Sequence, residues 1–201
     1  MTRTLRIICH PWRYRNRLRF ELRRLKLVWK ERRKHQRFEV AGSAIFYGLI
    51  RCGGRSSVTI GEDNALRLLC APRSGSGEIL IQARSPRSEI TIGKGNYFNN
   101  NTAIFANERV IIGDRCQIGN QVATYDRDFH EISSATRNRS AGPSQQVLIG
   151  NNVWLGSGVV VLKGVTIGDN SVLGAMSVVT GSIPANCVAA GNPAKVIRAI
   201  E

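Results

Sequence analysis

Aliphatic residues recur at every sixth position over the last third of the chain. The series runs Ile149, Leu155, Val161, Ile167, Leu173 and Val179, and a glycine follows four of its members. No α-helix repeats on six residues, whereas stacked, self-similar turns of chain have such a short fixed period. We expect each hexad to form one strand and one corner, with the aliphatic side chain inward and the glycine where the backbone turns. Three hexads close a triangular coil, so the sequence predicts an all-β solenoid with a continuous aliphatic interior.

The repeat begins earlier in a less regular form. Residues 58–61, 79–81 and 90–93 each resemble one hexad followed by a longer turn. Between residues 124 and 147 the pattern is absent and the segment is polar. A long excursion from a strict repeat is usually functional. We therefore place a β-helix at residues 53–190 with an excursion loop at 124–147, followed by a tail at 191–201 in which residues 194–200 are expected to form a short helix.

The first 52 residues form a basic extension. Residues 1–40 contain 14 Lys/Arg and three acids, which places a net charge of +11 out of the chain's +15 in this head. Residues 13–37 are predicted to be helical because the apolar residues Leu18, Leu22, Leu25 and Trp29 form one stripe. The stripe could cover the open end of the solenoid, or the basic faces could lie on anionic lipid headgroups, and both interpretations stay open. Few aromatic residues and no base-reading motif argue against nucleic acid.

The cysteines and the N-terminal sequence indicate the cellular compartment in which the protein is expected. Five cysteines are an odd number without paired spacing, which indicates reduced thiols and a cytoplasmic protein. Cys116 and Cys187 are expected to fill small core or corner positions. The N-terminus has no continuous apolar stretch typical of a secretory signal, and the apolar run at 41–50 is too short to span a bilayer. We expect a cytoplasmic chain, with peripheral contact at the inner membrane face through residues 1–40.

One histidine stands out in the repeat region. The chain has three histidines, and since His10 and His35 lie in the head, His130 is the imidazole of the excursion loop. Asp126 and Asp128 are near it in sequence, and either carboxylate, or a backbone carbonyl, could hold one ring nitrogen. The other nitrogen would then be free to take a proton as a general base. A single imidazole cannot build a zinc site that needs several, so no metal is predicted.

Three stretches together resemble a known family. Residues 153–158, 164–170 and 189–198 are similar to the hexapeptide-repeat acyltransferases, in the branch of maltose, galactoside and nodulation-factor O-acetyltransferases. The resemblance covers residues 90–200. It implies a left-handed parallel β-helix, an exception to the usual right-handed crossover. It also implies a homotrimer with active sites in the grooves between neighbouring solenoids, and acetyl-CoA as the acyl donor.

The resemblance carries roles to individual residues. It implies that His130 is the general base and that Asn99, Asn107 and Trp154 contact the acceptor. Asn107 stands where relatives often have an aspartate. A groove of small side chains suits the thin pantetheine arm of coenzyme A, and the matching positions are Gly156, Ser157, Ala175 and Thr180. Lys195 and Arg198 offer positive charge to the 3′-phosphate, whereas Gly181 replaces a lysine common in relatives.

These observations predict an acetyl-CoA-dependent O-acetyltransferase that acts on a sugar hydroxyl, in bacterial surface polysaccharide or glycoconjugate biosynthesis. Direct attack on the thioester is expected, since no serine or cysteine has a histidine of its own nearby. Two alternatives remain. An N-acyltransferase of an amino sugar would use the same base, and a non-catalytic β-helix scaffold would use the basic head as its interaction arm. Serine and antibiotic acetyltransferases match the chain less well.

Overall fold

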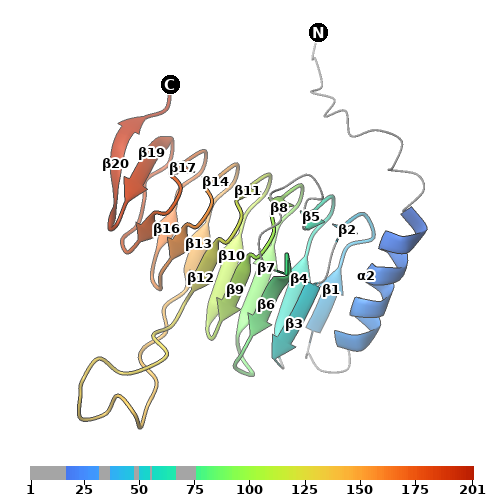
Figure 1. Cartoon of the computed structure of the whole chain (residues 1–201), viewed down its shortest axis with the longest axis horizontal. Coiled ribbons are helices and arrows are strands. Elements are labelled where there is room, and N and C mark those ends of the chain that lie inside the picture. Colours follow the sequence, from blue (N-terminus) through green and yellow to red (C-terminus); the bar gives the residue numbers. More distant parts are fainter. Residues whose placement is uncertain (1–16, 32–36, 48–49, 55, 67–75) are drawn as a thin grey trace.

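The chain winds into a parallel β-helix whose three faces are β-sheets (Figure 1). The computed structural model describes residues 17–31, 37–47, 50–54, 56–66 and 76–201. Sheet A consists of β1 (Arg37–Val40), β4 (Ser57–Ile60), β7 (Glu89–Ile92), β10 (Arg109–Ile112), β13 (Val147–Ile149) and β16 (Thr166–Ile167). Sheet B consists of β2 (Ile45–Phe46), β5 (Ala65–Leu66), β8 (Tyr97–Phe98), β11 (Gln117–Ile118), β14 (Trp154–Leu155), β17 (Val172–Leu173), β19 (Cys187–Gly191) and β20 (Ala194–Ala199). Sheet C consists of β3 (Ile50–Gly54), β6 (Ile79–Ala83), β9 (Ala103–Ala106), β12 (Ala123–Tyr125), β15 (Val160–Val161) and β18 (Val178–Val179).

The six-residue period sets the core, as the sequence predicted. All six members of the series from Ile149 to Val179 are at most 2% exposed. Within sheet C, the register stacks Ile81, Ile104, Thr124, Val161 and Val179 into one inward column. Burial of each aliphatic side chain contributes about 1.5–3 kcal/mol. The repeat therefore supplies both the coil geometry and the apolar interior that stabilises it.

The corners between sheets stack as closely as the strands do. A Cβ on Gly156 would lie 2.7 Å from the backbone nitrogen of Ala175 in the next coil. A side chain at this position would therefore push two coils apart. We call the turns that lead from sheet B to sheet C (99–102, 119–122, 156–159 and 174–177) the BC corner, and those that lead from sheet C to sheet A (107–108, 126–146, 162–165 and 180–182) the CA corner.

The β-helix begins one coil earlier than predicted. Strands β1, β2 and β3 form a complete first coil from residue 37 to residue 54, so the boundary at residue 53 is wrong. The charged residues Arg37 and Glu39 point outward and pair with each other at 3.0 Å, while Phe38 between them is 3% exposed. Alternating charges within a four-residue strand hid this coil from a search for aliphatic hexads. The predicted excursion loop is confirmed, because β12 ends at Tyr125 and β13 begins at Val147.

A helix covers the open end of the first coil. The predicted N-terminal helix is confirmed as α2 (Arg17–Glu31), which lies beside β1, β2 and β3 (Figure 1). The side chains that pack against the core are Leu27 and Val28. Leu22, Leu25 and Trp29 are 58%, 52% and 63% exposed, so the prediction that this stripe is the cap is wrong. The side chain of Leu18 lies outside the described residues. Of the part of the chain that the structure describes, no helix is long and apolar enough to cross a bilayer.

The opposite end closes with a hairpin instead of a helix. Residues 194–199 form β20, which pairs antiparallel with β19, so the predicted C-terminal helix is wrong. An uncovered last strand of sheet B would present unpaired backbone groups, and β20 occupies that edge. The β-branched residues Val196 and Ile197 favour an extended strand there. The two ends of the solenoid are therefore covered by different devices, α2 at one end and a hairpin at the other.

Candidate active site

The excursion loop is a self-supported antiparallel ribbon. Its two arms are joined by backbone hydrogen bonds from Gln145 to Asp126 (2.8 Å), from Asp128 to Pro143 (3.3 Å) and from Glu131 to Ser140 (3.3 Å). Further backbone bonds close a turn over residues 133–140 at the tip. The ribbon leaves the CA corner and projects away from the coils (Figure 1). It therefore presents its tip to solvent or to another molecule.

Asp126 fixes the base of this ribbon. Its carboxylate is 1% exposed and accepts hydrogen bonds from the backbone nitrogens of Asn107, Glu108 and Arg109, at 2.7 to 2.9 Å. Charge-assisted bonds of this kind are stronger than neutral ones. The carboxylate thus ties the start of the loop to the coil beneath it. The prediction that Asp126 orients the histidine is wrong.

Asp128 has a different partner as well. Its Oδ2 lies 2.8 Å from Nζ of Lys163, a residue of the CA corner one coil further along. This ion pair holds the rising arm of the ribbon against the solenoid. Asp128 therefore does not orient the histidine either.

A backbone carbonyl holds the imidazole of His130. Its Nδ1 lies 3.2 Å from the carbonyl oxygen of Arg137 in the tip of the ribbon. A carbonyl oxygen only accepts, so Nδ1 donates in this contact, and in the neutral ring with that tautomer Nε2 holds the lone pair. The side chain is exposed. A neutral imidazole with an accessible Nε2 is the arrangement that a general base needs.

A cluster of aromatic rings holds Phe129, the residue that precedes His130, against sheet C. Phe105 and Tyr125 stack on adjacent strands of sheet C, with ring centroids 5.1 Å apart and planes 7° apart. Phe129 sets its edge against both rings, and the guanidinium of Arg84 lies 5.0 Å from the Phe129 ring centroid. This aromatic cluster was not predicted from the sequence. The available signal was two aromatic residues in the outward position directly after an inward residue of the repeat.

The BC corner gathers three of the residues expected to hold the donor, Gly156, Ser157 and Ala175, together with Asn99, which was expected to contact the acceptor. Asn99, Gly119 and Gly156 stand one above the other, since the backbone nitrogen of each bonds to the coil that follows it at 2.8 or 2.9 Å. Oδ1 of Asn99 is buried and has no hydrogen-bond partner among the described residues. Ser157 and Ala175 are exposed in the same corner. The corner thus offers small side chains and the amide oxygen of Asn99.

The remaining predicted residues lie elsewhere. Trp154 is 55% exposed on sheet B, in a groove of about 560 Å³ that is also lined by Gln117 and Asn170. Asn107 donates from Nδ2 to Ser144 Oγ at 3.2 Å, and Thr180 follows β18 at the CA corner. Lys195 and Arg198 are exposed on β20. Sheet C separates the ribbon from the BC corner, so one chain does not bring all the predicted residues together.

The buried cysteines do not act as nucleophiles in this arrangement. Burial raises the pKa of the Cys116 thiol to about 11, so the thiol is protonated at neutral pH. Cys187 is buried too, which confirms the expected core positions for both residues. Within the described residues, no group of three His, Cys, Asp or Glu side chains is placed to hold a metal ion.

The coil geometry and the repeat define the class of this protein as a left-handed parallel β-helix of hexapeptide repeats. Residues 146–181 match the family model described as bacterial transferase hexapeptide (six repeats). Residues 146–181 thus carry the hexapeptide repeat of bacterial transferases, in agreement with the resemblance seen in the sequence.

Individual relatives narrow the comparison. Galactoside O-acetyltransferase of Escherichia coli K12 is 48% identical over 114 residues, which are 57% of this chain and 56% of that protein. A galactoside acetyltransferase in complex with coenzyme A is 34% identical over 76% of this chain and 66% of that one, with a TM-score of 0.55. A hexapeptide-repeat acetyltransferase of Vibrio cholerae complexed with acetyl coenzyme A has a TM-score of 0.53. The Vibrio protein is 29% identical over 57% of this chain and 61% of its own. The chain matches little more than half the length of the curated relatives.

Proposed function

We propose that this protein is an acetyl-CoA-dependent O-acetyltransferase that modifies a sugar hydroxyl, with His130 as general base. The observation that carries the proposal is the Nδ1 contact of His130 with the Arg137 carbonyl, which leaves Nε2 as a proton acceptor on an exposed ribbon. The galactoside O-acetyltransferase relatives, which are 48% and 43% identical over 114 and 112 residues, support this class of reaction.

The proposed reaction is a direct transfer. Acetyl-CoA supplies an acetyl group as a thioester. Nε2 of His130 takes the proton of the acceptor hydroxyl while its oxygen forms a bond to the acetyl carbonyl carbon. The carbon–sulfur bond breaks, and the proton passes from His130 to the departing thiolate. A protonated, buried Cys116 supports this route over an acyl-enzyme on that thiol.

The BC corner fits the donor. Gly156, Ser157 and Ala175 let a thin chain with amide groups approach the backbone, and a backbone N–H at Ser157 could stabilise the developing oxyanion. Removal of one such donor typically costs about a hundredfold or more in rate. Lys195 and Arg198 are exposed cations on β20 and suit the phosphates of coenzyme A. Thr180, at the CA corner, lies on the other side of sheet C from these residues.

A second copy of the chain completes the site in this proposal. The outer column of sheet C begins with the exposed Arg51 and continues with five half-buried apolar residues, Leu80, Ala103, Ala123, Val160 and Val178. An apolar outer sheet face is typical of an interface between subunits. Packing of neighbouring solenoids in a homotrimer would bring the ribbon of one copy toward the BC corner of the next. This arrangement agrees with the separation of His130 from Asn99 and Ser157 within one chain.

The acceptor is proposed to be a sugar contacted by Asn99, Asn107 and Trp154. Asn99 Oδ1 has no hydrogen-bond partner among the described residues and would accept from a sugar hydroxyl. A head with a net charge of +11 suits a cytoplasmic enzyme at the inner face of a membrane, where surface polysaccharides and glycoconjugates are assembled on lipid carriers.

Substitution of the proposed base tests the function. Acetyl-CoA consumption is measured for the full chain across a panel of free and carrier-linked glycans that includes amino sugars. His130→Ala should lower kcat by about a hundredfold or more without a change in melting temperature, because general-base catalysis typically supplies that factor. Glu131→Gln, on the same arm of the ribbon, serves as the matched control and should retain activity. If His130→Ala keeps its full rate on every acceptor that wild type uses, His130 is not the base.

A further inference from the structure

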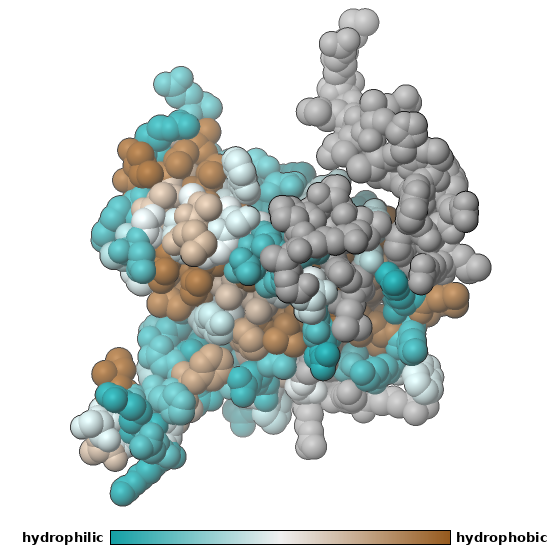
Figure 2. All heavy atoms as spheres, in the orientation of Figure 1, coloured by the Kyte–Doolittle hydropathy of each residue, from teal (hydrophilic) through white to brown (hydrophobic). Residues whose placement is uncertain are grey.

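The helix α2 has apolar side chains on a face that the solenoid does not cover. Leu22, Leu25 and Trp29 are each more than half exposed, although they recur with the spacing of one helical stripe. Figure 2 shows hydrophobic atoms at the outer edge of the end of the molecule where α2 lies. Scattered exposed apolar residues are ordinary, but a continuous stripe of two leucines and a tryptophan marks a surface for an apolar partner.

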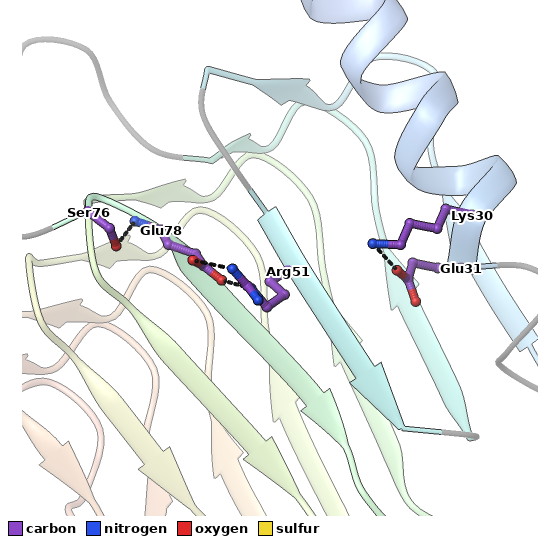
Figure 3. Close-up of polar contacts among 5 residues, drawn as sticks. All are labelled: Lys30, Glu31, Arg51, Ser76 and Glu78. Atoms are coloured by element: carbon purple, nitrogen blue, oxygen red, sulfur yellow. Dashed lines mark hydrogen bonds and ion pairs between the residues drawn. The ribbon is translucent and has the colours of Figure 1, made fainter.

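The face of α2 opposite this stripe packs against the first coil. Leu27 and Val28 pack against the core, and Glu31 is 1% exposed with Lys30 Nζ 3.9 Å from its carboxylate (Figure 3). Arg23 donates from Nη1 to the carbonyl oxygen of Tyr47 at 2.8 Å. These contacts fix the rotation of the helix about its own axis. The orientation of the exposed stripe is therefore set by the fold.

The helical period separates α2 into three sectors. At about 100° per residue, Leu22, Leu25 and Trp29 fall within about 60° of one another, and the sector of Leu27 and Val28 lies on the other side. The exposed or partly exposed basic residues Arg23, Lys26 and Lys30 occupy a sector beside the apolar stripe. An apolar stripe with lysine and arginine along its flank and a tryptophan among its members is typical of helices that lie in a membrane interface.

We infer that α2 is a two-faced helix, which caps the solenoid with Leu27 and Val28 and binds an anionic lipid surface with Leu22, Leu25 and Trp29. Charge complementarity selects this partner, because residues 1–40 carry a net charge of +11 and the first turn of α2 contains no acid. A second copy of the chain on the same stripe would bring two such heads together, and like charges disfavour that contact. The inference concerns lipid binding and does not depend on the proposed reaction.

Vesicle binding tests this surface directly. The full chain is sedimented with neutral phosphatidylcholine vesicles and with vesicles that contain phosphatidylglycerol, at low and high salt. Wild type should bind only the anionic vesicles, and salt should weaken the binding. The triple variant Leu22→Gln, Leu25→Gln, Trp29→Gln should lose at least tenfold in affinity. Arg23→Gln, Lys26→Gln, Lys30→Gln should also lose at least tenfold, at about fivefold per basic residue near the surface.

A control with the same change in charge separates the stripe from overall attraction. Arg87→Gln, Lys94→Gln, Arg115→Gln removes three exposed cations from the solenoid and should keep vesicle binding within about threefold of wild type. Equal losses in this control and in the Arg23, Lys26, Lys30 variant would overturn the inference.

The emission of Trp29 gives a second readout that does not depend on the folding of the stripe variant. In a chain with Trp12→Phe and Trp154→Phe, anionic vesicles should shift the emission to the blue, and brominated lipids should quench it. Unshifted emission would contradict insertion. If the stripe variant binds vesicles like wild type but changes the oligomeric state, the stripe is an interface between copies and the inference fails.

Discussion

The two aspartates that precede His130 illustrate how the same side chain serves different purposes in neighbouring positions. Asp126 accepts from three backbone nitrogens and holds the loop, whereas Asp128 pairs with Lys163. The imidazole is left to a backbone carbonyl. Short spacing in sequence showed that a carboxylate was within reach of the ring. It did not show that stronger partners, three N–H groups in one case and an ammonium in the other, compete for both carboxylates.

Asp126→Asn should destabilise the fold by about 3 kcal/mol, since an amide presents donors where the carboxylate accepts from backbone nitrogens in a buried site. Urea unfolding followed by circular dichroism measures the change. Asp128→Asn is the matched control and should cost less than about 1 kcal/mol, because its ion pair is partly exposed. Equal losses in the two variants would contradict the anchoring role of Asp126.

Cys116 should resist alkylation by iodoacetamide in the folded protein and react once urea exposes it. Its pKa of about 11 keeps the thiol protonated at neutral pH, and only the thiolate is nucleophilic. Because the folded pKa lies above the unfolded value, the associated stability is present below about pH 8.5 and is lost as the pH rises toward 11. Mass spectrometry of the peptide that contains Cys116 reports the labelling. Rapid labelling at pH 7 would show that the thiol is not buried in solution.

The ribbon and α2 were both predicted from the sequence, but the contacts that each makes with the coils were not. Loss of the hexad pattern located the ribbon to within a residue or two, because the repeat itself is a local signal. The face that α2 turns to the core was not predictable from its stripe. An amphipathic pattern shows that a helix has an apolar side, whereas Leu27 and Val28 pack inward because the shape of the first coil selects them. The hairpin at the C-terminus was missed for a similar reason, since β20 forms by pairing with β19, which would otherwise be the edge of sheet B.

Phe129→Ala should loosen the ribbon, because Phe129 contacts Phe105, Tyr125 and Arg84 at its base. Cleavage within residues 127–144 by a dilute protease should accelerate at least tenfold while the melting temperature of the coils changes little. On the proposed function, kcat should fall about tenfold or more with KM for acetyl-CoA unchanged, since His130 is the next residue and loses its position. Phe129→Tyr keeps the ring and should restore both values. Unchanged proteolysis would show that the ring cluster does not hold the ribbon.

For the whole molecule, the distribution of outward side chains distinguishes the three faces. Sheet A carries ion pairs such as Arg109 with Glu89 at 3.2 Å and suits contact with water, whereas the outer column of sheet C is apolar from Leu80 to Val178. The proposed site residues lie on both sides of sheet C. The asymmetry of the faces therefore supports an assembly in which sheet C meets a neighbouring copy.

Val160→Arg should shift the protein from trimer to monomer in light scattering coupled to size exclusion, because it places a charge in the centre of the proposed apolar interface. Activity should fall with the assembly. Thr166→Arg adds the same charge to the outer face of sheet A and should leave the assembly intact. A trimer that survives Val160→Arg would place the interface on another face.

The sequence by itself determined the coil, its aliphatic interior, the position of the interruption and the resemblance to hexapeptide-repeat transferases, because each of these repeats or occurs within a short stretch of chain. Only the tertiary structure decided which group holds His130, which face of α2 meets the core and how the C-terminal strand closes sheet B. Each of those outcomes depends on partners from other coils, which compete for the same side chains and backbone groups. The local sequence pattern shows which partners a side chain could have, and the distances between coils decide which of those contacts form.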